Sequence, residues 1–304
     1  MNTALDPMLG TVKVKYPGGE YKEFCVRYPC KGSDLLRQVT DGISYELDER
    51  KYFSLCFYHY AYGTRHWVYM DRPIGPQLRV HDTYADLTWY FSLEVMLYPK
   101  SPSSLVDDLA RNYMFLQLRD DVASGKLRAT TEIHERLGAV IAQLEFGDAP
   151  STMNDAYLDI LLKIKSVPDS EETRSKIFEH HQKLRGITVA EAQNRYMDLC
   201  KDLPLYGLHF FPAKDEENRE VKIVVGAVGI NIFQDGKILK RFPRGKYNCG
   251  GGKYSCGGNK LSINLVNAKE DDKNSKTTLE FFDHSHARFV AQCGYRYEIL
   301  YKDQ

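Results

Sequence analysis

The apolar residues of this 304-residue chain follow a two-residue period near both ends and a helical period in the middle. From Thr11 to Tyr16 polar and apolar side chains alternate, as in a half-buried strand. Between residues 104 and 203 apolar residues recur three and four positions apart, which is typical of amphipathic helices. Strand patterns return after Pro204. One core rarely serves a chain of this length, so the sequence predicts two or three compact units.

The first unit is predicted to be a β-grasp, as in ubiquitin. The turn at residues 17–19 joins two strands into a hairpin, Ser33 is a candidate N-cap for a helix over residues 33–39, and an aromatic-rich strand follows over 52–58. A junction rich in Pro and Ser at 98–103 interrupts the pattern. We therefore place this unit at residues 1–101.

The middle unit, residues 102–205, is predicted to be a helical bundle. One helix is expected over 131–146, where Gly147 and Pro150 stop it, and another over 171–184, with Gly186 suited to a left-handed C-cap. Thr188 and Glu191 match a capping box, in which each side chain accepts a free backbone N–H at the start of a helix. This helix should run to Leu203.

The third unit, residues 206–304, is predicted to be a β-sandwich closed by a helix, of the pleckstrin-homology (PH) or phosphotyrosine-binding (PTB) type. Strands are expected over 208–211, 221–225, 229–233, 260–266 and 277–282, with an Asp235-Gly236 hairpin turn. Apolar residues at helical spacing between Phe289 and Tyr297 indicate the closing helix.

Four stretches, in order along the chain, resemble one family. They are EVMLYP at 94–99, YMFLQLRDDV at 113–122, LRGITVAEA at 184–192, and LYGLHF at 205–210 followed by AKD at 213–215. Together with the order of the units they resemble the FERM family, named for band 4.1, ezrin, radixin and moesin. The chain departs from the family pattern at residues 146–149, at residues 241–244, and in a Gly/Cys-rich loop after them.

The resemblance implies an α+β fold with three lobes: a ubiquitin-like β-grasp, a helical bundle like acyl-CoA-binding protein, and a PH/PTB-like sandwich. It also implies a non-catalytic adaptor that binds cytoplasmic tails of transmembrane proteins and acidic phospholipids, and links the plasma membrane to the actin cytoskeleton or to signalling complexes. Two alternatives stay open: a targeting module of a larger enzyme, such as a FERM-containing tyrosine phosphatase, and an intramolecular regulatory clamp.

The sequence offers no catalytic motif. There is no Gly-x-Ser-x-Gly elbow, no His-Glu-x-x-His, no phosphatase Cys-x5-Arg loop, and no P-loop at residues 250–253. Cys200 lies in a helical pattern and is expected to be a core thiol. Cys249, Cys256, His284 and His286 lack zinc-ligand spacing. We expect no enzyme activity, no metal and no cofactor.

The charges are balanced overall, with 41 basic and 41 acidic residues. Zero net charge and the absence of a recognised motif argue against nucleic acid as a partner. With no signal peptide and no apolar run long enough for a membrane span, the chain is expected to be cytoplasmic and peripheral at the plasma membrane.

Positive charge is concentrated in the third unit, which has 16 basic and 12 acidic residues. From residue 237 to residue 260 no acidic residue interrupts the basic ones. We predict that this run binds anionic headgroups, at about 1 kcal/mol per basic residue near the surface; the alternative is a solvated strand edge. The predicted lipid-binding residues are Lys237, Lys240, Arg241, Arg244 and Lys246.

A peptide groove is the second predicted site. If the resemblance holds, a peptide can add to the sheet edge beside the closing helix. The predicted groove residues are Leu261, Ile263 and Leu265 on a strand, and Phe289, Val290, Cys293 and Tyr297 on the helix. The alternative, favoured for Ile263 and Phe289, is that they are core residues.

Overall fold

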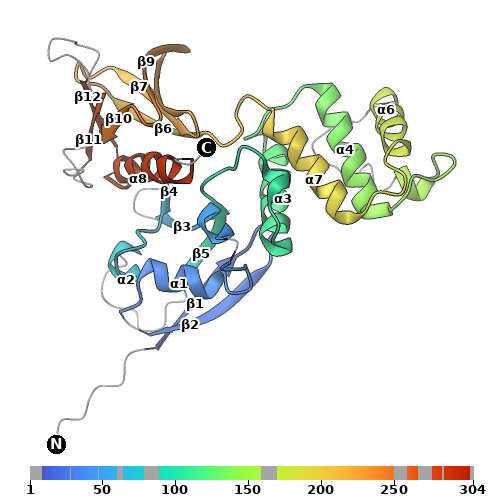
Figure 1. Cartoon of the computed structure of the whole chain (residues 1–304), viewed down its shortest axis with the longest axis horizontal. Helices are drawn as coiled ribbons and strands as arrows, with labels where there is room; N and C mark the ends of the chain where they lie inside the picture. The colour runs from blue at the N-terminus through green and yellow to red at the C-terminus, as the bar shows by residue number, and fades with distance from the viewer. Residues whose placement is uncertain are drawn as a thin grey trace, which may run out of the picture.

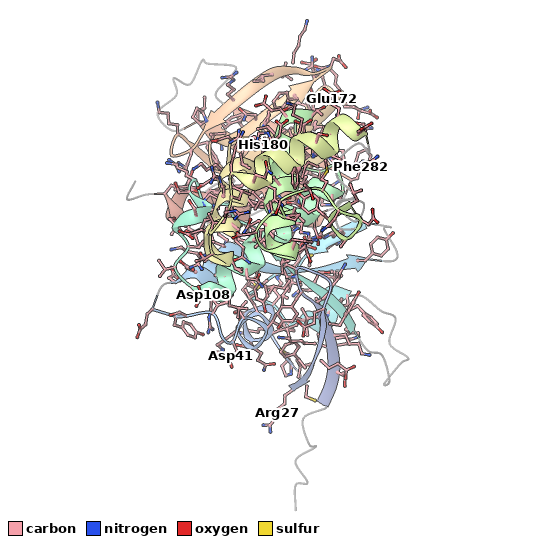
Figure 2. The ribbon with its side chains drawn as sticks, turned by 90° about the vertical axis from the view of Figure 1, so that its right-hand side faces the viewer. Arg27, Asp41, Asp108, Glu172, His180 and Phe282 are labelled. Carbon is pink, nitrogen blue, oxygen red and sulfur yellow. The ribbon has the colours of Figure 1, made fainter. Side chains whose placement is uncertain are left out.

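The computed structural model describes residues 9–27, 29–46, 48–59, 64–78, 89–158, 170–249, 259–265, 276–282 and 284–301. They form three lobes, with a sheet in the first and third lobes and helices in the second (Figure 1). The turned view shows that Arg27 in the first lobe and Glu172 in the second lie at opposite ends of the molecule (Figure 2). The predicted α+β class and its three lobes are confirmed.

The first lobe is a β-grasp whose five-stranded sheet has the order β2-β1-β5-β3-β4. Strands β1 and β5 run parallel, and the other neighbours run antiparallel. The elements are β1 (Leu9–Lys15), β2 (Tyr21–Arg27), α1 (Gly32–Val39), η1 (Glu49–Tyr52), β3 (Phe53–His59), β4 (Thr64–Trp67), α2 (Ile74–Leu78) and β5 (Trp89–Val95).

Helix α1 begins differently from the prediction. Lys31, and not Ser33, is the N-cap, and its side chain makes no capping bond. The backbone N–H of Ser33 instead donates to the carbonyl of Met70. The start of α1 is therefore held by the chain after β4, a long-range contact that a local capping rule does not detect.

The second lobe consists of helices that share a hydrophobic core with the first sheet. Val14 and Phe53 from the sheet belong to the same buried cluster as Met114 and Leu118 from α3. Thr188 and Glu191 form the predicted capping box of α7. Cys200 is fully buried, which raises the pKa of its thiol and confirms it as a core residue. The elements are η2 (Pro102–Ser104), α3 (Asp108–Ala123), α4 (Thr131–Phe146), α6 (Glu171–Gln182) and α7 (Val189–Lys201).

The third lobe is a seven-stranded antiparallel sheet in the order β10-β11-β12-β6-β7-β8-β9, closed by α8. The Lys240 ammonium on β9 donates to the carbonyl of Lys276 on β12, 3.1 Å away, so the sheet folds back on itself as a sandwich. Asp235 and Gly236 both have positive φ, as the predicted hairpin turn requires. The elements are β6 (His209–Lys214), β7 (Glu220–Gly226), β8 (Gly229–Gln234), β9 (Lys237–Pro243), β10 (Tyr247–Cys249), β11 (Lys260–Leu265), β12 (Lys276–Phe281) and α8 (His284–Leu300).

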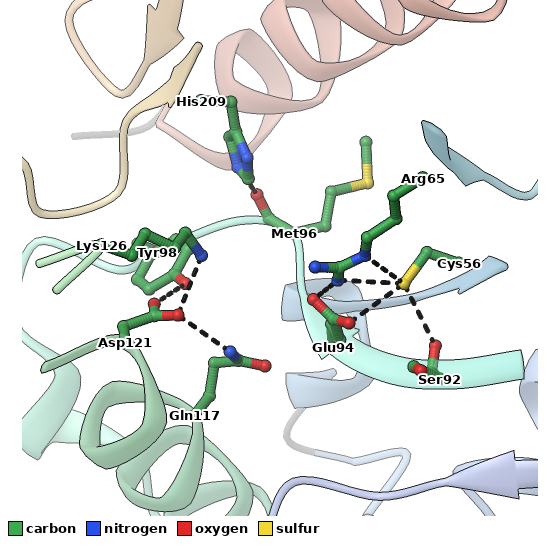
Figure 3. A network of polar contacts seen from close by, with 10 residues as sticks. All are labelled: Cys56, Arg65, Ser92, Glu94, Met96, Tyr98, Gln117, Asp121, Lys126 and His209. Carbon is green, nitrogen blue, oxygen red and sulfur yellow. Dashed lines mark hydrogen bonds and ion pairs between the residues drawn. The ribbon is translucent and has the colours of Figure 1, made fainter. Parts of the chain in front are cut away.

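The segment after β5 joins all three lobes. Met96 and Leu97 belong to the core of the third lobe. The Tyr98 hydroxyl donates to Asp121 on α3 at 2.8 Å, and Asp121 also accepts from Gln117 and Lys126 (Figure 3). Residues 96–98 thus connect the first lobe to side chains of the other two.

Helix α8 packs on the first lobe as well as on its own sheet. Phe289 stacks on Trp67 of β4, with ring centroids 5.1 Å apart. His209 lies edge-on to both rings and bonds the carbonyl of Met96 through Nε2 at 2.8 Å (Figure 3). Burial lowers the pKa of His209 to about 4, so the imidazole at this contact is neutral at pH 7.

Among the helices that the structure describes, none combines the length and the apolar character that crossing a bilayer requires.

Candidate lipid- and peptide-binding surfaces

The predicted basic run divides into two groups in the structure. Lys237 and Arg241 on β9 are exposed, and within the described residues neither forms an ion pair. Lys240 is partly covered, because its ammonium reaches across to Lys276. These three residues therefore gather positive charge on and beside the β8–β9 hairpin, at the outer edge of the third lobe (Figure 1).

The second group has structural contacts. The guanidinium of Arg244 lies 4.7 Å from the ring centre of Tyr301, and the ammonium of Lys100 lies 4.8 Å from the same centre. Glu298 on α8 interacts with Arg244, and burial raises the pKa of Glu298. Arg244 thus packs against the end of α8. Lys246, in contrast, is exposed in the turn before β10. Lys253 and residues 250–252 lie outside the described residues.

The predicted groove residues lie together, but in the core. Leu265 is half-buried, and the six others are at most 2% exposed. On α8, Phe289 contacts Trp67 and Phe211, so its ring joins two lobes. The core alternative therefore describes Leu261, Ile263, Phe289, Val290, Cys293 and Tyr297.

Strand β11 is an inner strand over part of its length. It pairs with β12 over residues 260–264 and with β10 over residues 263–265, so this part of β11 cannot accept an added strand. Strand β10, residues 247–249, is the edge of the sheet at this end. Beside it, α8 comes very close: a Cβ placed on Gly294 would lie 2.6 Å from the Tyr247 hydroxyl. Within the described residues, a strand added at this end could pair with β10, next to this contact.

A cleft between the first and third lobes was not predicted. It has a volume of about 640 Å³ and is lined by Arg72 from the first lobe and by Arg288, Gln292, Tyr295 and Arg296 from α8, with Met70 and Asp71. The guanidinium groups of Arg288 and Arg72 lie 4.7 and 5.9 Å from the ring centre of Tyr69. Such a pair of guanidinium groups suits a phosphate-bearing ligand.

Arg296 has a different role in this cleft. Its guanidinium donates to the Met96 sulfur and to the Lys51 carbonyl, each at 2.9 Å, so it ties α8 to the first lobe. Burial lowers the pKa of Arg296, and the guanidinium keeps its charge, as arginines in proteins do. The spacing of Arg288, Gln292 and Tyr295 places them on one helix face and was visible in the sequence. Their proximity to Arg72 depends on how the lobes pack.

The structure cannot place a metal site built from Cys249, Cys256, His284 and His286. Cys256 lies outside the described residues, as do the side chains of Cys249 and His284. Across the described parts of the chain, no group of three His, Cys, Asp or Glu side chains could hold a metal ion.

Comparison with known proteins identifies relatives of this chain. The sequence model of the FERM central domain matches residues 100–211. Band 4.1-like protein 3 from Homo sapiens is 32% identical over 213 residues, which are 70% of this chain and 19% of that protein. Protein 4.1 from Bos taurus is 30% identical over 222 residues, 73% of this chain and 34% of that protein.

A solved structure has the same fold. The FERM and C-terminal domain complex of Drosophila Merlin superposes with a TM-score of 0.77 at 20% identity and covers 96% of each chain. The chain spans between 12% and 34% of the length of the curated relatives that it matches.

Proposed function

We propose that this chain binds anionic headgroups and cytoplasmic tails of transmembrane proteins at the inner face of the plasma membrane. The proposal starts from its family: the chain is a FERM domain of the band 4.1, ezrin, radixin and moesin superfamily. It would join them to the cytoskeleton or to signalling proteins, as a non-catalytic adaptor. The observation that carries the lipid part is the pair of exposed cations on β9, Lys237 and Arg241, which form no ion pair within the described residues.

Vesicle binding tests this proposal. Vesicles of phosphatidylcholine with a phosphoinositide should bind the chain at low salt, and Lys237→Glu/Arg241→Glu should weaken binding. Each lost cation removes about 1 kcal/mol, so two lower the affinity by about 30-fold, and charge reversal lowers it further. The matched control is Lys15→Glu/Arg27→Glu, which changes the net charge by the same amount at two exposed positions on the first sheet. Equal binding by both variants would exclude the β9 cations.

The cleft is the second element of the lipid proposal. Arg72 and Arg288 approach from different lobes, so a phosphate held between them would contact both. Arg288→Gln should reduce the binding of a soluble inositol phosphate measured by calorimetry, whereas Arg27→Gln on the exposed end of β2 should not. Unchanged affinity in Arg288→Gln would remove the cleft from the proposal.

For tail peptides we propose the β10 edge, because β10 is the outermost strand at that end of the sheet among the described residues. A juxtamembrane tail peptide labelled with nitrogen-15 should show protected amides when it is bound. Binding with no protected peptide amide would exclude strand addition.

A further inference from the structure

Two consecutive apolar side chains project from the β8–β9 hairpin. Ile238 is 40% exposed and Leu239 is 42% exposed. In a regular strand neighbouring side chains point to opposite faces, so one exposed side chain would usually have a buried neighbour. The pairing explains the exception: Phe233 pairs with Ile238 and Ile232 pairs with Lys240, which leaves Leu239 as the extra residue of a β-bulge.

The bulge lies within the β9 cations described above. Lys237 precedes the apolar pair, and Lys240 and Arg241 follow it. The nearest acidic residue in the hairpin is Asp235 in the turn, which is exposed, and none of the three cations pairs with it. The hairpin therefore presents two aliphatic side chains with cations on both sides, at an edge of the third lobe remote from the first lobe (Figure 1).

We propose that the β8–β9 hairpin inserts Ile238 and Leu239 into the interfacial region of an anionic bilayer while Lys237 and Arg241 contact the headgroups. This inference rests on the lipid binding proposed above and adds a mode of attachment to it. Aliphatic side chains next to basic ones match the two layers of a bilayer surface, where acyl chains lie directly beneath anionic headgroups. The bulge leaves Leu239 unpaired, so both aliphatic side chains are exposed at the hairpin.

Salt separates the two contributions. Attraction between cations and headgroups weakens as salt rises, whereas the contribution of buried apolar surface does not. About two-fifths of each aliphatic side chain is available for burial, so each should raise partitioning by a factor on the order of five. Ile238→Ser/Leu239→Ser should thus lower binding roughly 20-fold at every salt concentration. Val228→Ser, which changes an exposed apolar residue at the other end of β8, is the matched control.

The experiment uses the full chain and mixed vesicles of phosphatidylcholine and phosphatidylserine, with circular dichroism to verify that each variant is folded. In a second measurement Leu239→Trp is bound to vesicles whose acyl chains carry bromine, which quenches tryptophan only at hydrocarbon depth. Quenching of the added fluorescence is expected, and Val228→Trp should not be quenched. The emission of Trp67 and Trp89 is subtracted with the unmodified chain.

The outcomes separate this inference from the lipid proposal. If the unmodified chain binds neither these vesicles nor the phosphoinositide vesicles described above, both are overturned. If it binds only the phosphoinositide vesicles, the insertion is wrong and the lipid proposal stands. If it binds and Lys237→Glu/Arg241→Glu weakens binding, but the double serine variant binds normally, the insertion is wrong and the lipid proposal stands. An unquenched Leu239→Trp in vesicle-bound protein likewise overturns the insertion, leaving electrostatic docking or an acidic protein as the ligand of the hairpin.

Discussion

The contact between Tyr98 and Asp121 offers a quantitative test of how the lobes are joined. Tyr98 is 4% exposed, and its hydroxyl donates to a carboxylate that is itself buried. Burial, and then the negative charge of Asp121, raise the pKa of Tyr98 well above its usual value, so the hydroxyl is protonated at neutral pH. A hydrogen bond to a charged acceptor contributes about 1.5 to 3 kcal/mol.

Tyr98→Phe should therefore reduce the free energy of unfolding by about 2 kcal/mol, because Asp121 keeps Gln117 and Lys126 as donors. Asp121→Ala should reduce it by about 3 to 5 kcal/mol, because it leaves a buried hydroxyl and a buried amide without their acceptor. The double variant should lose less than Asp121→Ala alone, because Tyr98→Phe also removes the buried hydroxyl that would lack an acceptor, which gives a coupling energy of more than about 2 kcal/mol.

Urea unfolding followed by tryptophan fluorescence measures these changes. Both tryptophans, Trp67 and Trp89, lie in strands of the first sheet, so they report on the lobe that precedes the contact. The comparison is valid where the dependence on urea keeps the same slope and only the midpoint moves. Additive losses in the double variant would refute the coupling, and an unchanged midpoint in Tyr98→Phe would show that the hydrogen bond contributes nothing.

Two further predictions concern local structure. The backbone N–H and the hydroxyl of Thr188 donate to the Glu191 carboxylate and lower its pKa. The carboxylate therefore stabilises the fold above its unfolded pKa of about 4.3, and this contribution is lost as the pH falls through the lower folded pKa. Glu191→Gln should have a lower melting temperature than the unmodified chain at pH 7, by a difference that shrinks in acid; a difference that does not change with pH would contradict the assignment. Gly207 has φ +64°, and a Cβ there would lie 2.8 Å from the Tyr98 Cβ, whereas at Gly186, φ +81°, it would meet nothing within 4 Å. Gly186→Ala should cost about 1 to 2 kcal/mol in urea unfolding and Gly207→Ala distinctly more, and equal losses would show that the Tyr98 contact yields without strain.

Local patterns in the sequence predicted local structure well. Helix α4 runs over residues 131–146 as expected, the capping box opens α7, and the Asp235-Gly236 turn joins β8 to β9. In each case the information lies within a few residues, since a cap or a tight turn depends on nearby backbone groups.

Features that depend on distant parts of the chain were predicted poorly. Which strand forms the sheet edge depends on the pairing of β10 with β11, and residues 250–259 separate the two strands in the sequence. The same apolar pattern on α8 is compatible with a groove or a core, and only the packing of Phe289 against Trp67 decides for the core. The cleft of Arg72 and Arg288 likewise exists only because two lobes meet.

The division of one core between two segments limits how these lobes can be exchanged. Met96 and Leu97 complete the interior of the third lobe, although they follow β5 of the first lobe and precede the whole helical bundle. A chimera that takes residues 206–304 from one FERM domain and the rest from another would therefore combine two halves of one interior from different parents. Substitutions in either segment are restricted by the other, so the three lobes should evolve together. A third lobe moved into another FERM domain should require the donor's residues at positions 96 and 97.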